Sequence, residues 1–262
     1  MDLGLTGKAV LVTAASKGLG KAAAMEMARN GARVAICSRS SAVDQAADDI
    51  RTSTGATVHA LQADLTRRDD VDRVVSSTLE RLGQLDILII NAGGPPPGSF
   101  LELGPQDWEA AVRLTLLSAV YLCYAVVPHM LERGEGSILA TQSISVRQPL
   151  DNLILSNSLR MAVIGLMKSL ANELGPKGIR VNSINPGWTR TERVDQLLID
   201  RAARNGTSVA DEAARVTRGI PLGRMGTVEE YGRAVAWLAS PAASYIDGHA
   251  LSFDGGAIQA SL

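Results

Sequence analysis

The first residues that could do chemistry form a glycine-rich turn near the start of the chain, Thr13-Ala14-Ala15-Ser16-Lys17-Gly18-Leu19-Gly20. The turn follows an apolar run and precedes an amphipathic stretch, so it should end a strand and open a helix. Backbone N–H groups at a helix N-terminus lack partners within the helix and bind phosphate readily. Because Gly18 and Gly20 let a ligand approach the backbone, the turn predicts a site for the pyrophosphate of a dinucleotide.

The elements around this turn alternate along the chain. In the first half we expect strands at 10–12, 34–36, 58–61 and 86–90, and helices at 20–30, 42–52 and 69–82. In the second half we expect helices at 105–130, 157–174 and 228–239, and strands at 137–140, 180–184 and 250–253. Pro128 should bend or end the first of these helices. The alternation predicts an α/β fold, a doubly wound parallel (Rossmann) sheet in three layers, with residues 1–262 forming a single domain.

The connection that follows the strand at 180–184 is long, charged and partly helical, with helices expected at 194–204 and 209–218. A long segment beyond the carboxyl end of a strand often covers a substrate. We therefore interpret residues 188–222 as a substrate lid. A solvated helix pair without that role is the alternative.

Composition narrows the classes of function. Apolar residues make up 46% of the 262 residues and aromatic residues only 3%, so the core should consist of Ala, Val, Ile and Leu. The net charge of −1 gives no basic excess for nucleic acid. We expect Cys37 and Cys123 to be buried, and the three histidines show no metal-ligand spacing, so no metal is expected. With no signal peptide and no stretch approaching about 18 apolar residues, we expect a cytoplasmic protein that does not enter the membrane.

Five motifs along the chain resemble the short-chain dehydrogenase/reductase family. The glycine-rich turn resembles the family's Thr-Gly-x-x-x-Gly-x-Gly, with Ala14 in place of the first glycine. The other four are Asp64-Leu65, Asn91-Ala92-Gly93, Asn185-Pro186-Gly187 with Thr191, and Asp247-Gly248-His249 with Phe253-Asp254-Gly255-Gly256. Within the family, the chain is most similar to the 3-oxoacyl-(acyl carrier protein) reductase group. The resemblance implies a nicotinamide dinucleotide as cofactor and a small carbonyl or alcohol as substrate.

The resemblance, together with the motifs, assigns a set of cofactor-binding residues. They are Thr13, Ala15, Ser16, Lys17, Gly18, Leu19, Gly20, Ser38, Arg39, Asp64, Leu65, Asn91, Ala92, Gly93, Arg160, Pro186, Gly187, Thr189 and Thr191. A carboxylate at the end of the second strand would accept the ribose 2′-OH of NAD, whereas a basic residue suits the 2′-phosphate of NADP. Here Ser38 and Arg39 occupy that position and Lys17 adds a second charge, so we expect NADP(H) to be preferred over NAD(H). If Arg39 is only a surface charge, the pocket has little preference.

The catalytic positions depart from the family pattern at three of four places. Ser143 matches the family's serine, but Ser156 stands at the tyrosine position, Arg160 at the lysine position and Thr115 at the asparagine position. A serine hydroxyl is far less acidic than a phenol with its pKa of about 10. Loss of a positioned acid typically slows a reaction by ~10²–10⁴-fold. Ser156 and Arg160 are one helical turn apart and should face the same site.

No other tyrosine is expected to supply the missing phenol. Tyr121 and Tyr124 should pack against a neighbouring helix, and Tyr231 and Tyr245 should be structural. The long helices at 107–127 and 157–174 resemble those through which the family forms homodimers or homotetramers, so we expect a homo-oligomer.

Three functions remain open. The first is an NADP(H)-dependent reductase of a 3-oxoacyl or other apolar ketone, with an altered proton donor; Leu150, Leu153 and Ile154 favour an apolar substrate. The second is a dinucleotide-binding protein whose chemistry has lapsed. The third is a non-redox enzyme similar to the halohydrin dehalogenases, which also carry arginine for lysine. Because those relatives keep the tyrosine and lose the nucleotide pocket, and this chain does the reverse, the third fits least well.

Overall fold

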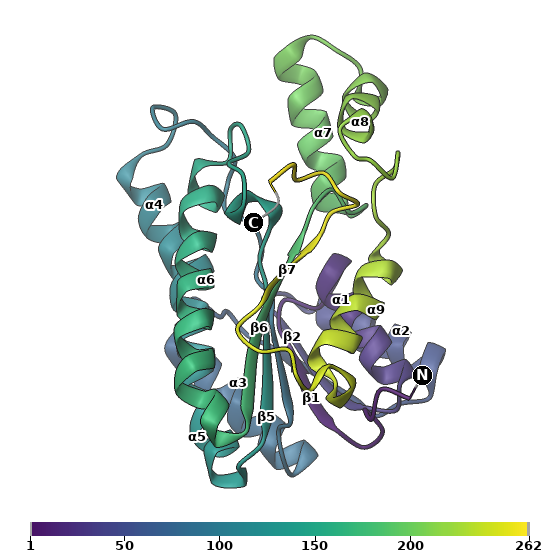
Figure 1. The fold of residues 1–262 in the computed structure, drawn as a ribbon, viewed down its shortest axis with the longest axis vertical. Coiled ribbons are helices and arrows are strands. Elements are labelled where there is room, and N and C mark those ends of the chain that lie inside the picture. The colour runs from purple at the N-terminus through teal and green to yellow at the C-terminus, as the bar shows by residue number, and fades with distance from the viewer. Residues whose placement is uncertain (1, 261–262) are drawn as a thin grey trace.

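The fold is a seven-stranded parallel sheet between helices, as expected (Figure 1). The structure, a computed structural model, describes residues 2–260. The strand order is β3-β2-β1-β4-β5-β6-β7, so the order in which the chain adds strands reverses between β1 and β4, and the sheet is doubly wound. The strands are β1 Ala9–Val12, β2 Arg33–Ser38, β3 Val58–Gln62, β4 Ile87–Ile90, β5 Gly136–Thr141, β6 Ile179–Pro186 and β7 Ala250–Phe253.

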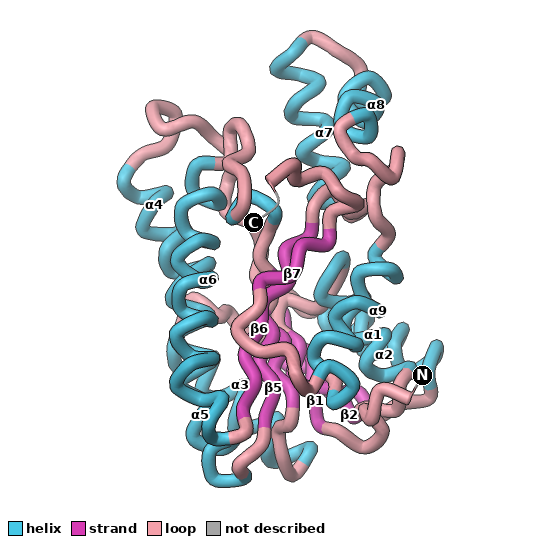
Figure 2. Tube along the Cα trace, viewed as in Figure 1, coloured by secondary structure: helices cyan, strands magenta, loops and turns pink. Residues whose placement is uncertain are grey.

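Helices cover both faces of this sheet and make it the middle layer of three. In the views of Figures 1 and 2, α1, α2 and α9 lie on one face and α3, α5 and α6 on the other. The continuous apolar runs of β1 and β4 are fully buried because both of their faces are covered. The helices are α1 Gly18–Arg29, α2 Ala42–Thr54, α3 Arg68–Leu82, α4 Pro105–Ala111, α5 Ser118–Arg133, α6 Ile154–Leu174, α7 Glu192–Asn205, α8 Val209–Arg218 and α9 Val228–Ala239.

The expected helix at 105–130 is longer and less regular than predicted. It runs from Pro105 to Arg133 and contains a π-helical turn, Val112–Leu117, between α4 and α5. Pro128 lies inside α5 and does not end it; the helix ends at Gly134, which has a φ of +68°. The buried side chains of Val126 and Met130, on either side of the proline, hold the helix on the sheet where one backbone hydrogen bond is lost.

Two other boundaries also differ from the prediction. Helix α6 begins at Ile154, three residues before the expected start, and β6 continues through Asn185 and Pro186. Pro186 is tolerated because β7 pairs along this end of the strand and Gly187, rather than Pro186, donates the next hydrogen bond, to Phe253.

The helix Pro105–Arg133 is more apolar than the sequence analysis expected. By length and composition alone, Pro105–Arg133 is apolar enough to cross a membrane, so the expectation that no stretch approaches this limit was wrong. In the fold, Leu122, Val126 and Met130 from this helix are fully buried in the core shared by α3, α6 and the sheet. The helix is therefore a core helix of the three-layer fold. Cys37 and Cys123 are buried as expected, and burial raises the pKa of each thiol to about 12.

Helices α7 and α8 project beyond the carboxyl edge of the sheet, at the top of Figure 1. They pack through a small apolar cluster of their own, which includes Val194, Leu198 and Val216. Thr191 caps α7 by accepting the backbone N–H of Val194, and Ser208 with Asp211 forms a capping box on α8. The pair is thus a small folded unit placed above the strand ends.

Candidate active site

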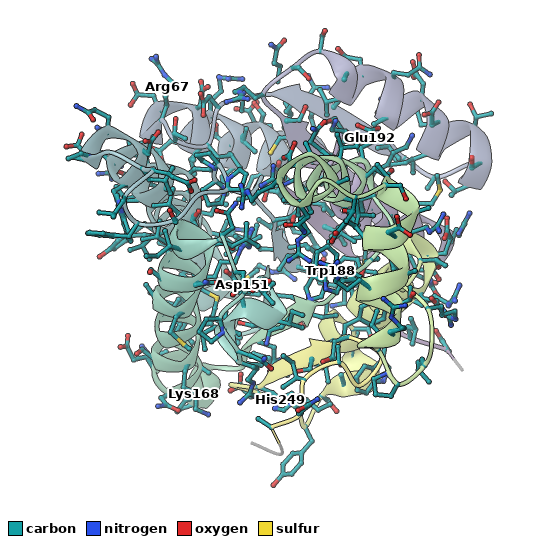
Figure 3. The ribbon with its side chains drawn as sticks, turned by 90° about the horizontal axis from the view of Figure 1, so that it is seen from above. Arg67, Asp151, Lys168, Trp188, Glu192 and His249 are labelled. Carbon is teal, nitrogen blue, oxygen red and sulfur yellow. The ribbon has the colours of Figure 1, made fainter. Side chains whose placement is uncertain are left out.

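A cavity of about 580 Å³ lies at the carboxyl ends of β1 to β6, beside the point where the strand order reverses. This is where doubly wound sheets bind their ligands. Figure 3 looks down on this edge and shows Trp188 and Glu192 on the side of α7, with Asp151 across from them at the entry to α6. The cavity therefore lies between the segment that carries α7 and the start of α6.

The glycine-rich turn is held open by hydrogen bonds to neighbouring strands. Thr13 Oγ1 donates to the Asn91 carbonyl at 2.7 Å and accepts the Asn91 N–H at 2.9 Å. The Asn91 side chain donates to the Ala14 carbonyl at 3.2 Å, and the Ala15 N–H donates to the Cys37 carbonyl at 2.9 Å. Thr13 and Ala15 thus brace the turn from outside the cavity, and Ser16, Lys17 and Gly18 face into it.

Backbone geometry explains the glycines in the turn. A Cβ at position 20 would lie 2.5 Å from the Ala14 carbonyl oxygen and 2.7 Å from Asn91 Nδ2, so Gly20 is required by close packing. Gly18 has a φ of +55°. Ala14, which replaces the family's first glycine, also has a positive φ, +48°, and is therefore strained. The backbone therefore keeps the left-handed conformation of the motif at position 14, although glycine, which adopts it without strain, is absent there.

The ends of β2 and β3 form the far end of the cavity. Ser38, Arg39, Asp64 and Leu65 all line it, and no carboxylate follows β2. Arg39 is exposed, and its guanidinium makes no hydrogen bond or ion pair within residues 2–260. Asp64 accepts two hydrogen bonds from Thr66 through its side chain.

The opposite end of the cavity brings together Ser143, Ser156 and Arg160. Ser143 follows β5, and its Oγ accepts the N–H of Ser145, which leaves its hydroxyl proton free for a ligand. Arg160 Nε donates to Ser156 Oγ at 3.0 Å across one turn of α6. Arg160 Nη1 reaches the Gln142 carbonyl at 3.2 Å and lies 3.4 Å from the Thr141 carbonyl. The predicted pairing of Ser156 with Arg160 on one helix face is confirmed.

Arg160 is a buried cation with no carboxylate against it. Its side chain is 9% exposed, and its partners in the described residues are the Ser156 hydroxyl and two backbone carbonyls. Burial, with a contribution from the neighbouring Arg193, lowers the pKa of Arg160 to about 10. Arg160 therefore remains charged at neutral pH and adds a positive field to the end of the cavity where Ser143 and Ser156 lie, here called the catalytic end for its predicted role.

Thr115 lies within the π-helical turn and is buried, but it does not line the cavity. Its Oγ1 has no hydrogen-bond partner in the described residues. Leu114, one residue earlier, is the residue of this turn that faces the cavity. A π-helical turn has no reliable sequence signature, so sequence reasoning missed this shift of one residue.

No tyrosine lines the cavity within the described part of the chain. Tyr121 packs against the core and Tyr231 is buried against Thr141, as expected for packing and structural roles. Tyr124 is exposed instead of packed, and Tyr245 is fully exposed instead of structural. The sequence placed Tyr124 on a helix but did not show that it lies on the outer face of α5. None of the four replaces the missing phenol.

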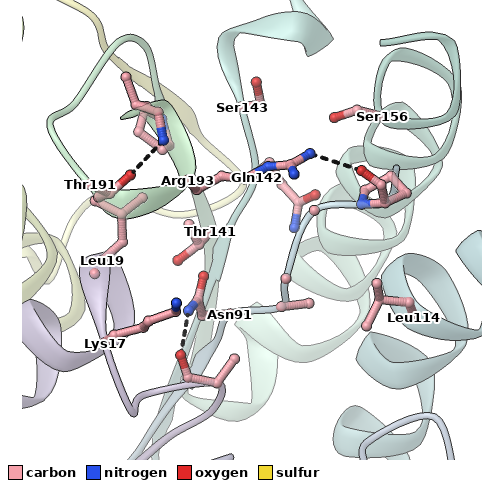
Figure 4. Close-up of a pocket in the computed structure, with 18 of the residues that line it drawn as sticks. Lys17, Leu19, Asn91, Leu114, Thr141, Gln142, Ser143, Ser156, Thr191 and Arg193 are labelled. Carbon is pink, nitrogen blue, oxygen red and sulfur yellow. Dashed lines mark hydrogen bonds between the residues drawn. The ribbon is translucent and has the colours of Figure 1, made fainter. Parts of the chain in front are cut away.

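The beginning of the segment 188–222 contacts both sides of the cavity. Thr191 lies against Gly18, where a Cβ at position 18 would be 3.5 Å from its methyl group. Glu192 forms an ion pair with Lys17, so Lys17 is not free in this structure. Arg193 crosses the cavity and donates to the Pro95 carbonyl at 3.0 Å (Figure 4). Within the lid, the Arg201 guanidinium stacks over Trp188 at 4.7 Å from the ring centre.

The structure gathers most of the predicted site residues into this one cavity. Apart from the catalytic group, the following predicted residues line it: Ser16, Lys17, Gly18, Leu19, Ser38, Arg39, Asp64, Leu65, Asn91, Ala92, Gly93, Pro186, Gly187, Thr189 and Thr191. Thr13, Ala15, Gly20 and Thr115 lie behind its wall. Sequence reasoning missed Gln142, Trp188, Glu192 and Arg193, which also line it. Each of the four lies within two residues of a predicted site residue in the sequence. That proximity was the only feature of the sequence that could have identified them.

The cavity fits a dinucleotide. The turn offers unpaired backbone amides where α1 begins. The space that a Cβ at Gly20 would fill is taken by the Ala14 carbonyl and the Asn91 side chain, which shape the turn. The cavity extends from Arg39 and Asp64 at one end to Ser143 and Ser156 at the other. Residues able to hold an adenosine, a pyrophosphate and a reacting group therefore follow one another along it.

Comparisons with known proteins agree with this geometry. Residues 13–257 match the family model described as Enoyl-(Acyl carrier protein) reductase. A 3-oxoacyl-[acyl-carrier-protein] reductase of a Synechocystis strain is 32% identical over 258 residues, covering 97% of this chain and 98% of the relative.

Solved structures show the same similarity. L-sorbose reductase from Gluconobacter frateurii, complexed with NADPH and L-sorbose, superposes with a TM-score of 0.94 at 31% identity, covering 99% of this chain and 100% of that one. A 7α-hydroxysteroid dehydrogenase complexed with NADH and 7-oxo glycochenodeoxycholic acid superposes with a TM-score of 0.90 at 29% identity, covering 99% and 97%.

Proposed function

This chain belongs to the short-chain dehydrogenase/reductase family, and from that premise we propose that it is an NADP(H)-dependent carbonyl reductase with an altered proton donor. The observation that carries the proposal is the single cavity that joins the glycine-rich turn to Ser143, Ser156 and Arg160. The substrate is a 3-oxoacyl compound or another ketone with an apolar part, because Leu114, Leu150 and Leu153 line the catalytic end.

Reduction needs a hydride and a proton. The bound reduced nicotinamide would deliver the hydride to the carbonyl carbon, and the oxygen would take a proton to give the alcohol. Ser143 orients the substrate by donating its free hydroxyl proton to the carbonyl oxygen. The remaining task for the chain is to deliver a proton near that oxygen.

Ser156 and Arg160 are placed for this task, although less favourably than a tyrosine and a lysine. Arg160 Nε donates to Ser156 Oγ, so the Ser156 hydroxyl must direct its own proton elsewhere, toward the cavity. The positive charge also favours negative charge developing on that oxygen. Ser156 thus hydrogen-bonds the substrate and passes on a proton from water. Arg160 also holds ribose hydroxyls of the cofactor with its remaining donors.

The cofactor preference rests on Arg39. Its guanidinium is exposed at the cavity and unpaired in the described residues, and no carboxylate follows β2 to accept a 2′-OH. Because a charge-assisted, two-pronged contact with phosphate contributes about 1.5–3 kcal/mol, Arg39→Ala should weaken NADPH binding about tenfold to hundredfold. NADH binding should change less than about twofold. Fluorescence titration measures both, and Arg29→Ala, at the far end of α1, is the control. Equal losses for NADPH and NADH would refute the assignment.

A dinucleotide-binding protein with lapsed chemistry is the second candidate, favoured by the absence of any tyrosine from the described cavity lining. One experiment separates the two functions. The purified protein is titrated with NADPH and then incubated with NADPH and a panel of ketones and aldehydes. Binding with turnover supports the reductase, and binding without turnover supports the second candidate. A chain that binds neither NADPH nor NADH refutes both.

We also propose the remaining properties that the family resemblance implies. Helices α5 and α6 carry the contacts of a homodimer or homotetramer, and the protein acts in the cytoplasm on a small molecule. The segment 188–222 acts as a substrate lid, because Glu192 and Arg193 already contact opposite sides of the cavity. Size-exclusion chromatography with light scattering tests the assembly. A monomer would contradict it.

A further inference from the structure

The two ends of the cavity differ in the way that their charges are balanced. Only two carboxylates line the cavity in the described residues, Asp64 and Glu192. Asp64 lies at the end where Arg39 is found, and Glu192 is paired with Lys17 at the glycine-rich turn. At the catalytic end, Arg160 and Arg193 therefore face the cavity without any carboxylate to compensate them.

Arg193 directs its charge to the catalytic end. Its Nη2 donates to the Pro95 carbonyl, two residues beyond the Asn91-Ala92-Gly93 motif. In the view of Figure 4, the Arg193 side chain extends in the direction of Gln142 and Ser156 and away from Lys17. It is close enough to Arg160 to contribute to lowering the pKa of that residue, which two like charges do when no anion separates them.

Gln142 provides a second, independent observation. The residue is 5% exposed and lines the cavity, yet its Oε1 has no hydrogen-bond partner in residues 2–260. A buried amide is normally hydrogen-bonded, so an unpartnered one at a cavity wall indicates a ligand that supplies the missing contact. The two ends of a carboxamide are interchangeable by a rotation, so Gln142 can donate as readily as it accepts.

We propose that the carbonyl substrate carries a carboxylate, which Arg193 binds with Gln142 as a second donor and Arg160 as a background positive charge. This inference rests on the proposed function and specifies its substrate class as an oxo acid with a short apolar chain. Leu114, Leu150 and Leu153 form an apolar wall for the chain of the substrate. The guanidinium groups of Arg160 and Arg193 supply the positive charge that its carboxylate requires. The phosphates of the cofactor are the other possible oxyanion, and the test separates the two.

The test uses hexanoate and hexanamide, which share a chain but differ in charge and cannot be reduced. Each is titrated calorimetrically into the protein saturated with NADP⁺ and, in parallel, into the protein alone. We expect hexanoate to bind the saturated protein at least about tenfold more tightly than hexanamide. Arg193→Ala should remove this preference and change hexanamide binding less than about twofold, and Arg193→Lys should restore part of it.

Two further variants sharpen the result. Arg190→Ala, three residues earlier on the lid and outside the cavity, removes the same charge and should change neither ligand. Gln142→Leu should weaken hexanoate several-fold, because it keeps the volume and removes the donor.

Equal binding of hexanoate and hexanamide overturns the proposal. So does an Arg193→Ala variant that loses NADPH affinity while it keeps the preference for hexanoate, because Arg193 then serves the cofactor's phosphate. Failure of the wild-type protein to bind NADPH refutes the proposed function separately. In that case the titration of the protein alone tests the carboxylate site. Tighter binding of hexanoate than of hexanamide supports the site, and equal binding refutes it.

Discussion

The two ends of the cavity differ in how completely their buried polar side chains are hydrogen-bonded. At the end formed by the glycine-rich turn, here called the nucleotide end for its predicted ligand, Thr13, Asn91 and Ala15 hydrogen-bond to one another and to the neighbouring strands. At the catalytic end and just behind it, several buried polar atoms have no partner in the described residues. They belong to Thr115, Gln142, Ser145 and Asn185. A further such atom, on Arg133, lies far from the cavity at the opposite edge of the sheet.

This difference indicates at which end the buried polar side chains have partners without a ligand, and at which end they need one. A buried polar group without a partner costs about 1–3 kcal/mol, and a buried charge without a counter-ion costs more. The side chains that brace the glycine-rich turn avoid this cost before any ligand binds. The catalytic end holds Arg160 and Gln142 at some cost to stability, which is reasonable if a substrate and cofactor satisfy them.

The largest expected effect comes from rebuilding the catalytic end. Ser156→Tyr combined with Arg160→Lys restores the acid and the flexible cation that the family uses. If the nucleotide end is intact, this double variant should raise kcat/KM for ketone reduction by about 10²–10⁴-fold. Reduction is followed as NADPH consumption with a substrate that the wild type turns over slowly.

A matched control isolates the phenol. Ser156→Phe with Arg160→Lys supplies the same ring without a hydroxyl and should show no gain. Adding Ser143→Ala to the tyrosine variant should reduce the gain, because the substrate carbonyl loses its second hydrogen bond. A tyrosine variant no faster than the phenylalanine variant would mean that the catalytic end serves another reaction.

The next effect damages the nucleotide end. Gly20→Ala places a methyl group 2.5 Å from the Ala14 carbonyl oxygen, which belongs to rigid backbone. Overpacking of this kind costs about 1–3 kcal/mol, so NADPH should bind roughly tenfold to hundredfold more weakly. Gly219→Ala adds the same group where the nearest atom is 3.4 Å away and should bind NADPH normally. Unchanged NADPH affinity in Gly20→Ala would show that the turn does not hold the cofactor.

Sequence reasoning succeeded where local pattern determines structure. The strand runs, the glycine-rich turn and the helix α9 were all predicted, because hydrophobic period and turn chemistry are local. It failed where tertiary packing decides. Pro128 remains helical because Val126 and Met130, on either side of it, are buried. The π-helical turn places Leu114, not Thr115, at the cavity. Arg193 and Gln142 were missed because their importance comes from the charges and partners around them in space.

The catalytic end should also be a source of instability. Burial lowers the pKa of Arg160 to about 10, well below the pKa of the same guanidinium in the unfolded chain. The unfolded chain therefore holds this proton more tightly, and the whole penalty applies at every pH below about 10. The penalty is relieved only as the pH rises above about 10, toward the higher pKa of the guanidinium in the unfolded chain.

Arg160→Met should remove this penalty at pH 7. It also removes the hydrogen bonds to Ser156 and the Gln142 carbonyl, which offsets part of the gain. We expect the free energy of unfolding to rise by about 1–2 kcal/mol in urea titrations without cofactor. NADPH affinity should fall in the same variant, because a ribose partner is lost. A variant that is less stable than the wild type would show that the hydrogen bonds of Arg160 outweigh its desolvation.

The smallest expected effect tests whether the nucleotide end is fully relaxed. Ala14 has a φ of +48°, where an L-residue other than glycine is strained by about 1–2 kcal/mol. Ala14→Gly removes this strain but adds conformational freedom to the unfolded chain, so the net gain should be about 0.5–1 kcal/mol in the free energy of unfolding. Asn152→Gly is the matched control, because Asn152 also has a positive φ, +61°, which asparagine tolerates well, and should gain less. If Ala14→Gly gains stability but NADPH affinity is unchanged, the strain at Ala14 is independent of the ligand. If affinity falls, the alanine holds the turn in the shape that phosphate requires, and the nucleotide end, like the catalytic end, trades stability for binding.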